Sequence, residues 1–590
     1  MFLPTTHDEL DKLGWDRLDI IFVTGDTYID SPYTGVALLG KLLVKEGFRV
    51  GVIAQPDIKS NVDIRRLGEP RLFWGVTSGS VDSMVANYTA TKKWRKNDDY
   101  TPGGINNRRP DRAVIAYTNL VRRYFKETCP IIIGGIEASL RRVAHFDFWS
   151  NKVRRSILFD SKADILVYGM AETTVTELAR ALDQKLDITA IRGLCYILKS
   201  VPQDYIQLPS FEESFADKGS FTDAFCLFYA NNDPVTAKGL AQGHLDRFLI
   251  QNPPQPTLTT PEMDAVYDLE FEREAHPFYT RDGRVKALDT IRFSIPTHRG
   301  CYGECNFCAI AVHETRTVGW RSRESIISEA EALTRHPDFR GIISDVGGPT
   351  ANMYGFECTK KLDRGACPDK RCLFPKVCKS LKPDHSRQIE LLSDIRKIPG
   401  IRKVFIASGL RPDLVFADKN HGTAYLKTVV NNHVSGQMKI APEHTETKIL
   451  ELMGKPDSAT LKMFKEKFDR LSKKSGKKQF LTYYLIAAHP GSTMEEMKKL
   501  KEFCSTMLKI NPEQTQIFTP TPSTFSTLMY YTQKDPFSGR SIFVERNLSA
   551  KESQKNILTT PIRPDSRRPD TKKPGDRRPH NRKTRNKKKK

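Results

Sequence analysis

Short apolar runs alternate with amphipathic stretches over the first 200 residues of the chain. Residues 18–23 form an apolar run that ends in a turn signal, residues 35–46 have a helical pattern, and residues 49–54 form the next apolar run. Similar runs occupy residues 72–77, 131–133 and 165–168. Strands separated by helices predict an open parallel sheet, with a ligand site beyond the carboxyl ends of its strands. We therefore expect an α/β domain over residues 1–200.

A second alternation of the same kind begins after a gap. Residues 201–285 lack the pattern and contain Pro253-Pro254-Gln255-Pro256, so they are interpreted as a connector. Six apolar runs follow within residues 286–535, at 291–295, 341–345, 403–407, 437–440, 480–486 and 514–518. Six strands with helices between them predict a partial (β/α)6 barrel, whose chemistry gathers at the loops after the strands. Residues 351–385 are then an insertion in this barrel, and residues 536–590 are a C-terminal extension.

The charge of the chain is concentrated at its C-terminal end. Residues 563–590 hold fourteen Lys or Arg and three Asp, which is +11 of the formal net charge of +23. A tail with so few apolar residues is predicted to be disordered and to contact nucleic acid. There is no apolar run of about 18 residues, which predicts no membrane segment. The start of the chain has no leader pattern, so the expected location is the cytoplasm.

Eleven cysteines in a reducing compartment indicate metal binding more than disulfides. Three of them lie after the first predicted barrel strand, in Cys301-Tyr302-Gly303-Glu304-Cys305-Asn306-Phe307-Cys308. Three thiolates on a short loop can hold three irons of a [4Fe–4S] cluster and leave the fourth iron open to a ligand. The alternative is a zinc site completed by His298 or His313.

The spacing C-x3-C-x-aromatic-C resembles the radical S-adenosylmethionine (SAM) superfamily. The resemblance implies that Cys301, Cys305 and Cys308 ligate the cluster and that Phe307 lies near the adenine of SAM. It also implies an electron donor such as flavodoxin or ferredoxin. The reduced cluster would cleave SAM to a 5′-deoxyadenosyl radical, which attacks a substrate.

Further positions follow from the same resemblance. Gly347 and Gly348 correspond to a stretch that contacts the methionine amino group, although Pro349 replaces the glutamate of the superfamily pattern. Gly409 and Arg411, after the third barrel strand, are expected to line the ribose. Asp345, Glu443 and His444 are further candidates for the cavity.

Four longer stretches are similar to the YgiQ-type radical proteins, a family without an established reaction. The resemblance covers about residues 1–535. The stretches are Gly25-Asp26-Thr27-Tyr28-Ile29-Asp30, Gly134-Gly135-Ile136-Glu137-Ala138-Ser139, Ser344-Asp345-Val346-Gly347-Gly348-Pro349-Thr350 and Lys439-Ile440-Ala441-Pro442-Glu443-His444.

The N-terminal sheet also resembles the cobalamin-binding domains that precede some radical enzymes. Such domains use a D-x-H-x-x-G loop whose histidine ligates cobalt. The matching loop here is Asp30-Ser31-Pro32-Tyr33-Thr34-Gly35. Because Pro32 cannot ligate a metal, the domain is predicted to carry little cobalamin.

A second group of cysteines lies in the predicted insertion. Cys358, Cys367, Cys372 and Cys378 stand in a basic segment, at spacings that match no common zinc finger. They are interpreted as a second metal site, holding either an auxiliary iron–sulfur cluster or zinc, and chance thiols are the alternative.

Taken as a whole, the chain is interpreted as a radical SAM enzyme of unknown substrate, with RNA or protein favoured by the basic tail. The alternative is a non-catalytic nucleic-acid-binding protein whose cysteines hold structural metals.

Overall fold

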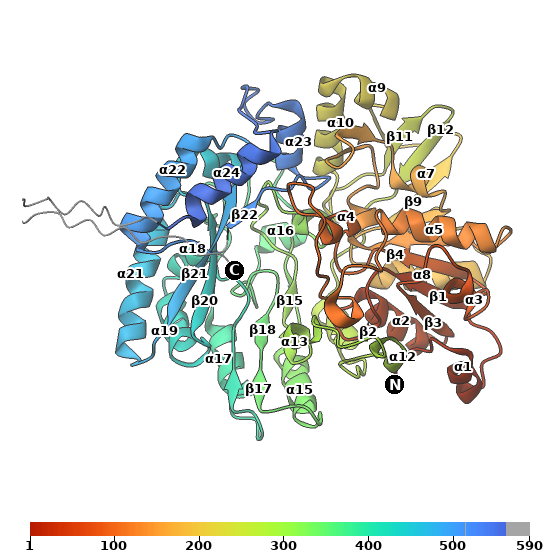
Figure 1. Ribbon diagram of the computed structural model, residues 1–590, viewed down its shortest axis with the longest axis horizontal. Helices are drawn as coiled ribbons and strands as arrows, with labels where there is room; N and C mark the ends of the chain where they lie inside the picture. Colours follow the sequence, from red (N-terminus) through yellow and green to blue (C-terminus); the bar gives the residue numbers. More distant parts are fainter. Residues whose placement is uncertain (514, 562–590) are drawn as a thin grey trace, which may run out of the picture.

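The chain folds into two α/β units that lie side by side in the computed structural model (Figure 1). The structure describes residues 1–513 and 515–561. The basic tail predicted to be disordered, residues 563–590, lies outside these residues. Within the described ranges, no helix is both long and apolar enough to cross a bilayer. The predicted α/β class is confirmed.

The N-terminal unit is built on a nine-stranded sheet of order β10-β11-β12-β9-β8-β5-β4-β1-β3. Five of its strands are mutually parallel. They are β1 (Ile20–Thr24), β3 (Val50–Ala54), β4 (Phe73–Thr77), β5 (Ile131–Gly134) and β8 (Ile165–Val167). In β1, Ile21 and Val23 pack in the layer of α5 (Ala113–Tyr124), whereas Ile20 and Phe22 pack in the layer of α2 (Gly35–Lys45) and α8 (Glu172–Asp183). Helices on both faces explain why these strands are apolar throughout.

Residues 201–285 are not the connector that the sequence predicts. They supply α9 (Phe211–Ala216), α10 (Lys218–Ala230), β10 (Ile206–Leu208), β11 (Leu240–His244) and β12 (Arg247–Gln251). Together with β9 (Leu194–Leu198), these strands extend the sheet mainly through antiparallel pairs, so the sheet is mixed. The strand pattern is hidden because β11 buries polar side chains. Gln242, for example, accepts a hydrogen bond from the Ala144 N–H at 2.7 Å and donates one to the Pro209 carbonyl at 3.0 Å.

The second unit carries six strand positions in the predicted order. β14 (Ser294–Pro296) pairs with β18 (Asp345–Gly347), β17 (Ile342–Ile343) with β19 (Lys403–Val404), and β21 (Phe480–Ala487) with both β20 (Gln437–Glu443) and β22 (Thr515–Ile517). A parallel bridge between Leu410, which follows β19, and Ile440 of β20 joins the β17–β19 pair to the β20–β22 group. All of these strand pairs are parallel. The first strand begins later than predicted, because Leu288–Ile291 is the short helix α13 with Leu288 buried.

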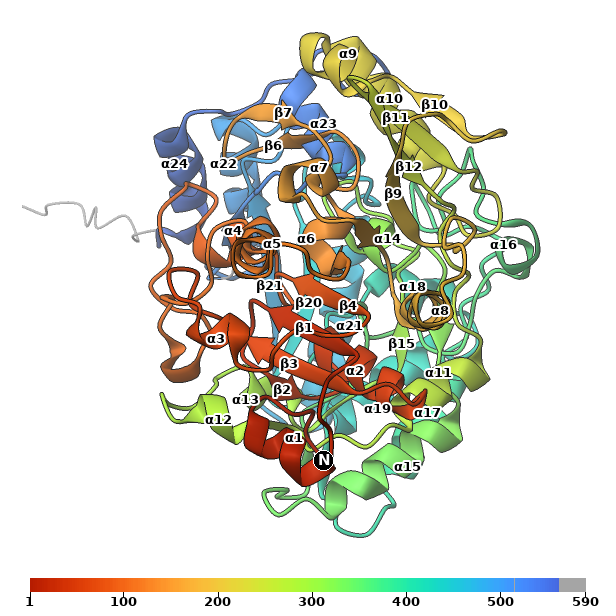
Figure 2. The same ribbon diagram turned by 90° about the vertical axis from the view of Figure 1, so that its right-hand side faces the viewer.

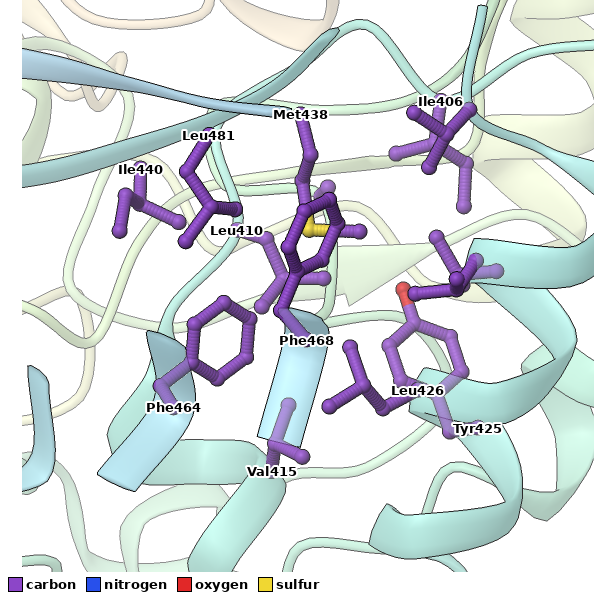
Figure 3. Close-up of a cluster of buried hydrophobic side chains, with 14 of the residues drawn as sticks. Ile406, Leu410, Val415, Tyr425, Leu426, Met438, Ile440, Phe464, Phe468 and Leu481 are labelled. Atoms are coloured by element: carbon purple, nitrogen blue, oxygen red, sulfur yellow. The ribbon is translucent and has the colours of Figure 1, made fainter. Parts of the chain in front are cut away.

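Three helices, α17 (Ser386–Ile395), α19 (Gly422–Asn432) and α21 (Ala459–Lys474), cover one face of these strands (Figure 1). Figure 3 shows Met438 of β20 and Leu481 of β21 among Phe464, Phe468 and Leu426 of the helices. Phe464 and Phe468 are completely buried, and burial of such a ring contributes about 1.5–3 kcal/mol. Because successive residues of a strand face opposite sides, the residues between the core positions face the inside of the barrel.

The two units meet through buried polar contacts, and Figure 2 looks onto the N-terminal unit with the barrel behind it. Arg299 of the barrel forms a buried ion pair with Glu172 of α8, and its Nε donates a hydrogen bond to the Tyr267 hydroxyl at 2.9 Å. The side-chain amide of Asn232 in the N-terminal unit donates to the Ala311 carbonyl at 3.0 Å. Arg299 and Ala311 flank the three-cysteine motif, so this motif lies next to the boundary between the units.

Candidate active site

The three-cysteine motif forms a tight loop between β15 (His298–Arg299) and α14 (Ile310–His313). Gly300 has a φ of +80°, and a Cβ at this position would lie 2.2 Å from the Thr317 carbonyl oxygen. A Cβ at Gly303 would lie 2.9 Å from Nη1 of Arg411 and 3.2 Å from Sγ of Cys301. The backbone therefore passes so close to these groups that glycine is required at Gly300 and favoured at Gly303.

The loop forms one wall of a cavity of about 220 Å³. Its other walls come from segments that follow the barrel strands, as expected for this architecture. The structure brings eight of the predicted residues to this cavity. They are Cys301, Cys305, Phe307, Cys308, Gly409, Arg411, Glu443 and His444.

Gly347 and Gly348 do not line the cavity. A Cβ on Gly347 would lie 2.7 Å from Ser408 Oγ, and one on Gly348 would lie 2.7 Å from His298 Nε2. The two glycines therefore allow close packing of neighbouring segments, and Pro349 and Thr350 line the cavity beside them. Asp345, a predicted cavity residue, also has a structural contact, because its Oδ1 accepts a hydrogen bond from the Ala407 N–H at 2.7 Å.

Arg411 places a buried positive charge beside the sulfur atoms. Its Nη1 lies 3.9 Å from Cys305 Sγ, and its Nη2 lies 2.6 Å from Oδ2 of Asp413. Burial disfavours the charged guanidinium, but Asp413 and the two nearest cysteines more than offset this and hold the pKa of Arg411 above its usual range. Burial likewise opposes ionisation of Asp413, but Arg411 holds the pKa of that carboxyl below its usual range. The pair is therefore charged at neutral pH.

The same cavity contains a second polar group, Glu443 with Lys455. Glu443, at the end of β20, has a φ of +66° and lies after a register shift in the strand. Its Oε1 is 3.6 Å from Nζ of Lys455. Burial raises the pKa of Glu443, and Lys455 opposes this shift. A side chain held in this sparsely populated conformation and aimed at a cavity is typical of a functional site.

His444 follows Glu443 and is completely buried. Its Nδ1 accepts a hydrogen bond from the Glu446 N–H at 3.1 Å, whereas its Nε2 has no partner within the described part of the chain. Burial lowers its pKa to about 4, so the imidazole is neutral at pH 7. Sequence reasoning had identified Glu443 and His444 as candidates but not Lys455 or Asp413, because neither belongs to a motif.

The zinc alternative for the three-cysteine loop does not fit the geometry. His298 uses both ring nitrogens, with Nδ1 2.8 Å from Thr297 Oγ1 and Nε2 2.9 Å from the Thr350 carbonyl. His313 lines a different cavity, between the two units. A single metal ion needs several ligand atoms close together. Among the described residues, two groups of three side chains of the types His, Cys, Asp or Glu have their ligand atoms within 4.8 Å of one another, and neither group includes a cysteine. The three thiols and these two histidines are therefore not arranged as one tetrahedral zinc site.

These features define a radical SAM enzyme. Residues 2–294 match the model described as "Radical SAM N-terminal", and residues 295–504 match that of the radical SAM superfamily. The chain belongs to the UPF0313 family within this class, which confirms the resemblance to the YgiQ-type proteins. It is 57% identical over 559 residues to a UPF0313 protein of Fusobacterium nucleatum, covering 95% of this chain and 98% of that one. The UPF0313 protein of Thermotoga maritima is 50% identical over 562 residues, with the same two shares covered.

Two solved structures of radical SAM enzymes with cobalamin bound are also similar. TsrM of Kitasatospora setae, a radical SAM methyltransferase with cobalamin and a [4Fe–4S] cluster bound, has a TM-score of 0.47 at 14% identity, covering 86% of this chain and 76% of that one. OxsB with aqua-cobalamin and SAM bound has a TM-score of 0.48 at 12% identity, covering 88% of this chain and 55% of that one.

The expectation that the N-terminal domain carries little cobalamin is contradicted by these cobalamin-bound matches, together with the match of residues 2–294 to the radical SAM N-terminal model. That expectation rested on Pro32 alone. A proline at this position removes one imidazole ligand from the loop but does not by itself prevent cobalamin from binding, so it was too narrow a basis for the prediction.

Proposed function

We propose that this protein cleaves SAM reductively at a [4Fe–4S] cluster held by Cys301, Cys305 and Cys308, and that the resulting 5′-deoxyadenosyl radical removes a hydrogen atom from its substrate. The observation that carries the proposal is the shared cavity, which is lined by the three thiols, Phe307 and the buried cation of Arg411. Membership of the radical SAM superfamily supports the same chemistry.

The bound cluster would supply an electron and an open iron for the amino and carboxylate groups of SAM. The protein supplies the surroundings. Arg411 offsets negative charge near Cys305, and Asp413 holds its guanidinium in place. Leu410, Ile440 and Leu450 add apolar walls that exclude water from the cavity. Lys455 and Glu443, which also line the cavity, offer a donor and an acceptor for the hydroxyl groups of a ligand.

Anaerobically purified protein is expected to form 5′-deoxyadenosine from SAM when dithionite supplies the electron. In the cell, we propose that a flavodoxin or a ferredoxin does so. The product is measured by liquid chromatography, and the Cys226→Ala variant is the control, because Cys226 is exposed and outside the site. A colourless protein that forms no product would support a structural role for the cysteines instead.

The tail after residue 562 favours a macromolecular substrate, RNA or protein, because its charge is not needed for a small molecule. We predict that removal of residues 563–590 leaves SAM cleavage unchanged and weakens RNA binding at low salt, since fourteen cations are lost. The measurement is RNA retention over a range of salt concentrations. If truncation stops SAM cleavage, the tail belongs to the reaction site and this role is wrong.

A further inference from the structure

The insertion between β18 and α17 has little regular structure of its own. Within residues 351–385, which the structure describes completely, the only helix is α16 (Thr359–Arg364), and there is no strand. Five apolar side chains of the insertion are buried in a small hydrophobic cluster with Tyr302 of the cysteine loop, and they are Met353, Phe356, Cys358, Leu373 and Leu381. Ala351 and Tyr354 are instead buried in the core of the barrel. So few apolar side chains bury little surface for a segment of this length, so another source of order is expected.

The same cluster gathers most of the thiols in the insertion. Cys358 is 7% exposed within it, and Cys372 and Cys378 pack against it, partly buried. The N–H of Cys378 donates to the Cys372 carbonyl at 2.8 Å, which closes the turn between them. Cys367 is exposed, five residues before Cys372. Three of the four thiols therefore lie around one small core, and the fourth is exposed.

A buried cation is directed at one of these sulfur atoms. Lys361 is 4% exposed, and its Nζ lies 3.8 Å from Cys372 Sγ and 2.9 Å from Glu357 Oε1. It also donates a hydrogen bond to the Arg316 carbonyl at 2.8 Å. An ammonium group in this position can donate a hydrogen bond to the Cys372 sulfur, as the groups that surround a metal ligand commonly do.

The sulfur atoms are not arranged for a single zinc ion. A tetrahedral zinc with Zn–S bonds of about 2.3 Å holds its sulfurs about 3.8 Å apart. No three of these thiols are that close, because no cysteine belongs to a group of three with ligand atoms within 4.8 Å among the described residues. The spacing of the four cysteines along the chain also matches no common zinc finger, so iron–sulfur is the metal centre that we favour.

We propose that Cys358, Cys367, Cys372 and Cys378 hold a second iron–sulfur cluster, distinct from the one at Cys301, Cys305 and Cys308. This site is independent of SAM cleavage and stabilises the insertion against Tyr302. Its four thiols leave no open iron, so SAM does not bind there.

The decisive test uses a variant that lacks the three cysteines of the SAM-cleaving cluster. The triple variant Cys301→Ala/Cys305→Ala/Cys308→Ala leaves the insertion intact, and we expect it to retain about four irons and four sulfides per chain, against about eight in the wild type. Its electron paramagnetic resonance signal after reduction should not change when SAM is added. A triple variant that contains no iron, or one zinc in place of iron, would overturn the proposal.

The reciprocal variant is Cys358→Ala/Cys372→Ala, which should lose about four irons while SAM still perturbs the remaining signal. Its control is Cys195→Ala/Cys504→Ala, because these two cysteines are also buried but lie outside the insertion. Cys367→Ala tests the exposed ligand, and its control is Cys226→Ala, because Cys226 is also exposed. Complete retention of iron in Cys367→Ala would overturn the four-cysteine assignment.

If the reciprocal variant fails to fold, the triple variant still decides the question. If the triple variant binds iron but the wild type forms no 5′-deoxyadenosine, the proposed function fails and this proposal stands.

Discussion

Replacement of Cys301, Cys305 or Cys308 by Ala is expected to reduce 5′-deoxyadenosine formation to the background of the assay. Each thiolate binds a different iron of the proposed cluster, so the loss of one ligand opens a second iron and destabilises the whole cluster. The measurement is product formation under dithionite, together with the iron content of each purified variant. Cys226→Ala is the matched control and should retain full activity.

Neither His298 nor Glu304, two potential ligands beside and within the motif, is free to replace the missing sulfur. Both ring nitrogens of His298 already have hydrogen-bond partners, and the carboxylate of Glu304 is paired with Arg316 at 3.1 Å and accepts from the Tyr229 hydroxyl. Substantial product from any one of the three single variants would show that the cluster is held elsewhere.

Replacement of Arg411 by Met is expected to slow SAM cleavage by about tenfold or more, which corresponds to about 1.4 kcal/mol in the barrier. Reduction adds an electron to the cluster, so the loss of a buried positive charge 3.9 Å from Cys305 Sγ makes reduction more difficult. The midpoint potential, measured by redox titration, should therefore become more negative. Arg411→Lys keeps the charge and should shift the potential less, although it loses the paired contacts with Asp413.

A structural effect has to be separated from this electrostatic effect. Arg411→Met leaves the buried Asp413 unpaired, and such a loss typically costs about 3–5 kcal/mol of stability. The double variant Arg411→Met/Asp413→Asn removes the unpaired charge and should recover much of the thermal stability, while the potential stays low. If Arg411→Met alone leaves the potential at its wild-type value, Arg411 acts only by holding the loop in place.

The sequence predicted well the parts of the fold in which a single requirement, either burial on both faces or the spacing of ligands, determines the residue types. β1 is buried on both faces, so its apolar run identified it, and the spacing of the three cysteines identified the cavity wall. By contrast, Gln242 in β11 is buried with its hydrogen bonds satisfied by other segments, which made a sheet strand look like a loop.

Site residues were missed for a related reason. Lys455 reaches Glu443 from a loop twelve residues away, and no local pattern reports such a contact. Gly347 and Gly348 were assigned to SAM by their resemblance to a motif, whereas the structure packs them against Ser408 and His298. A glycine pair is equally compatible with ligand binding and with close packing, and only the surrounding atoms distinguish the two.

The ion pair between Arg299 and Glu172 couples the cofactor loop to the boundary between the units. Arg299 is separated from Cys301 by one residue, and its partner lies on a helix of the N-terminal sheet. Any cofactor that orders the loop therefore also favours the contact between the units, and by thermodynamic linkage a firm contact favours retention of the cofactor. Damage to the cluster by oxygen would thus weaken the contact between the two units. The rate of proteolysis would then depend on whether the cluster is intact.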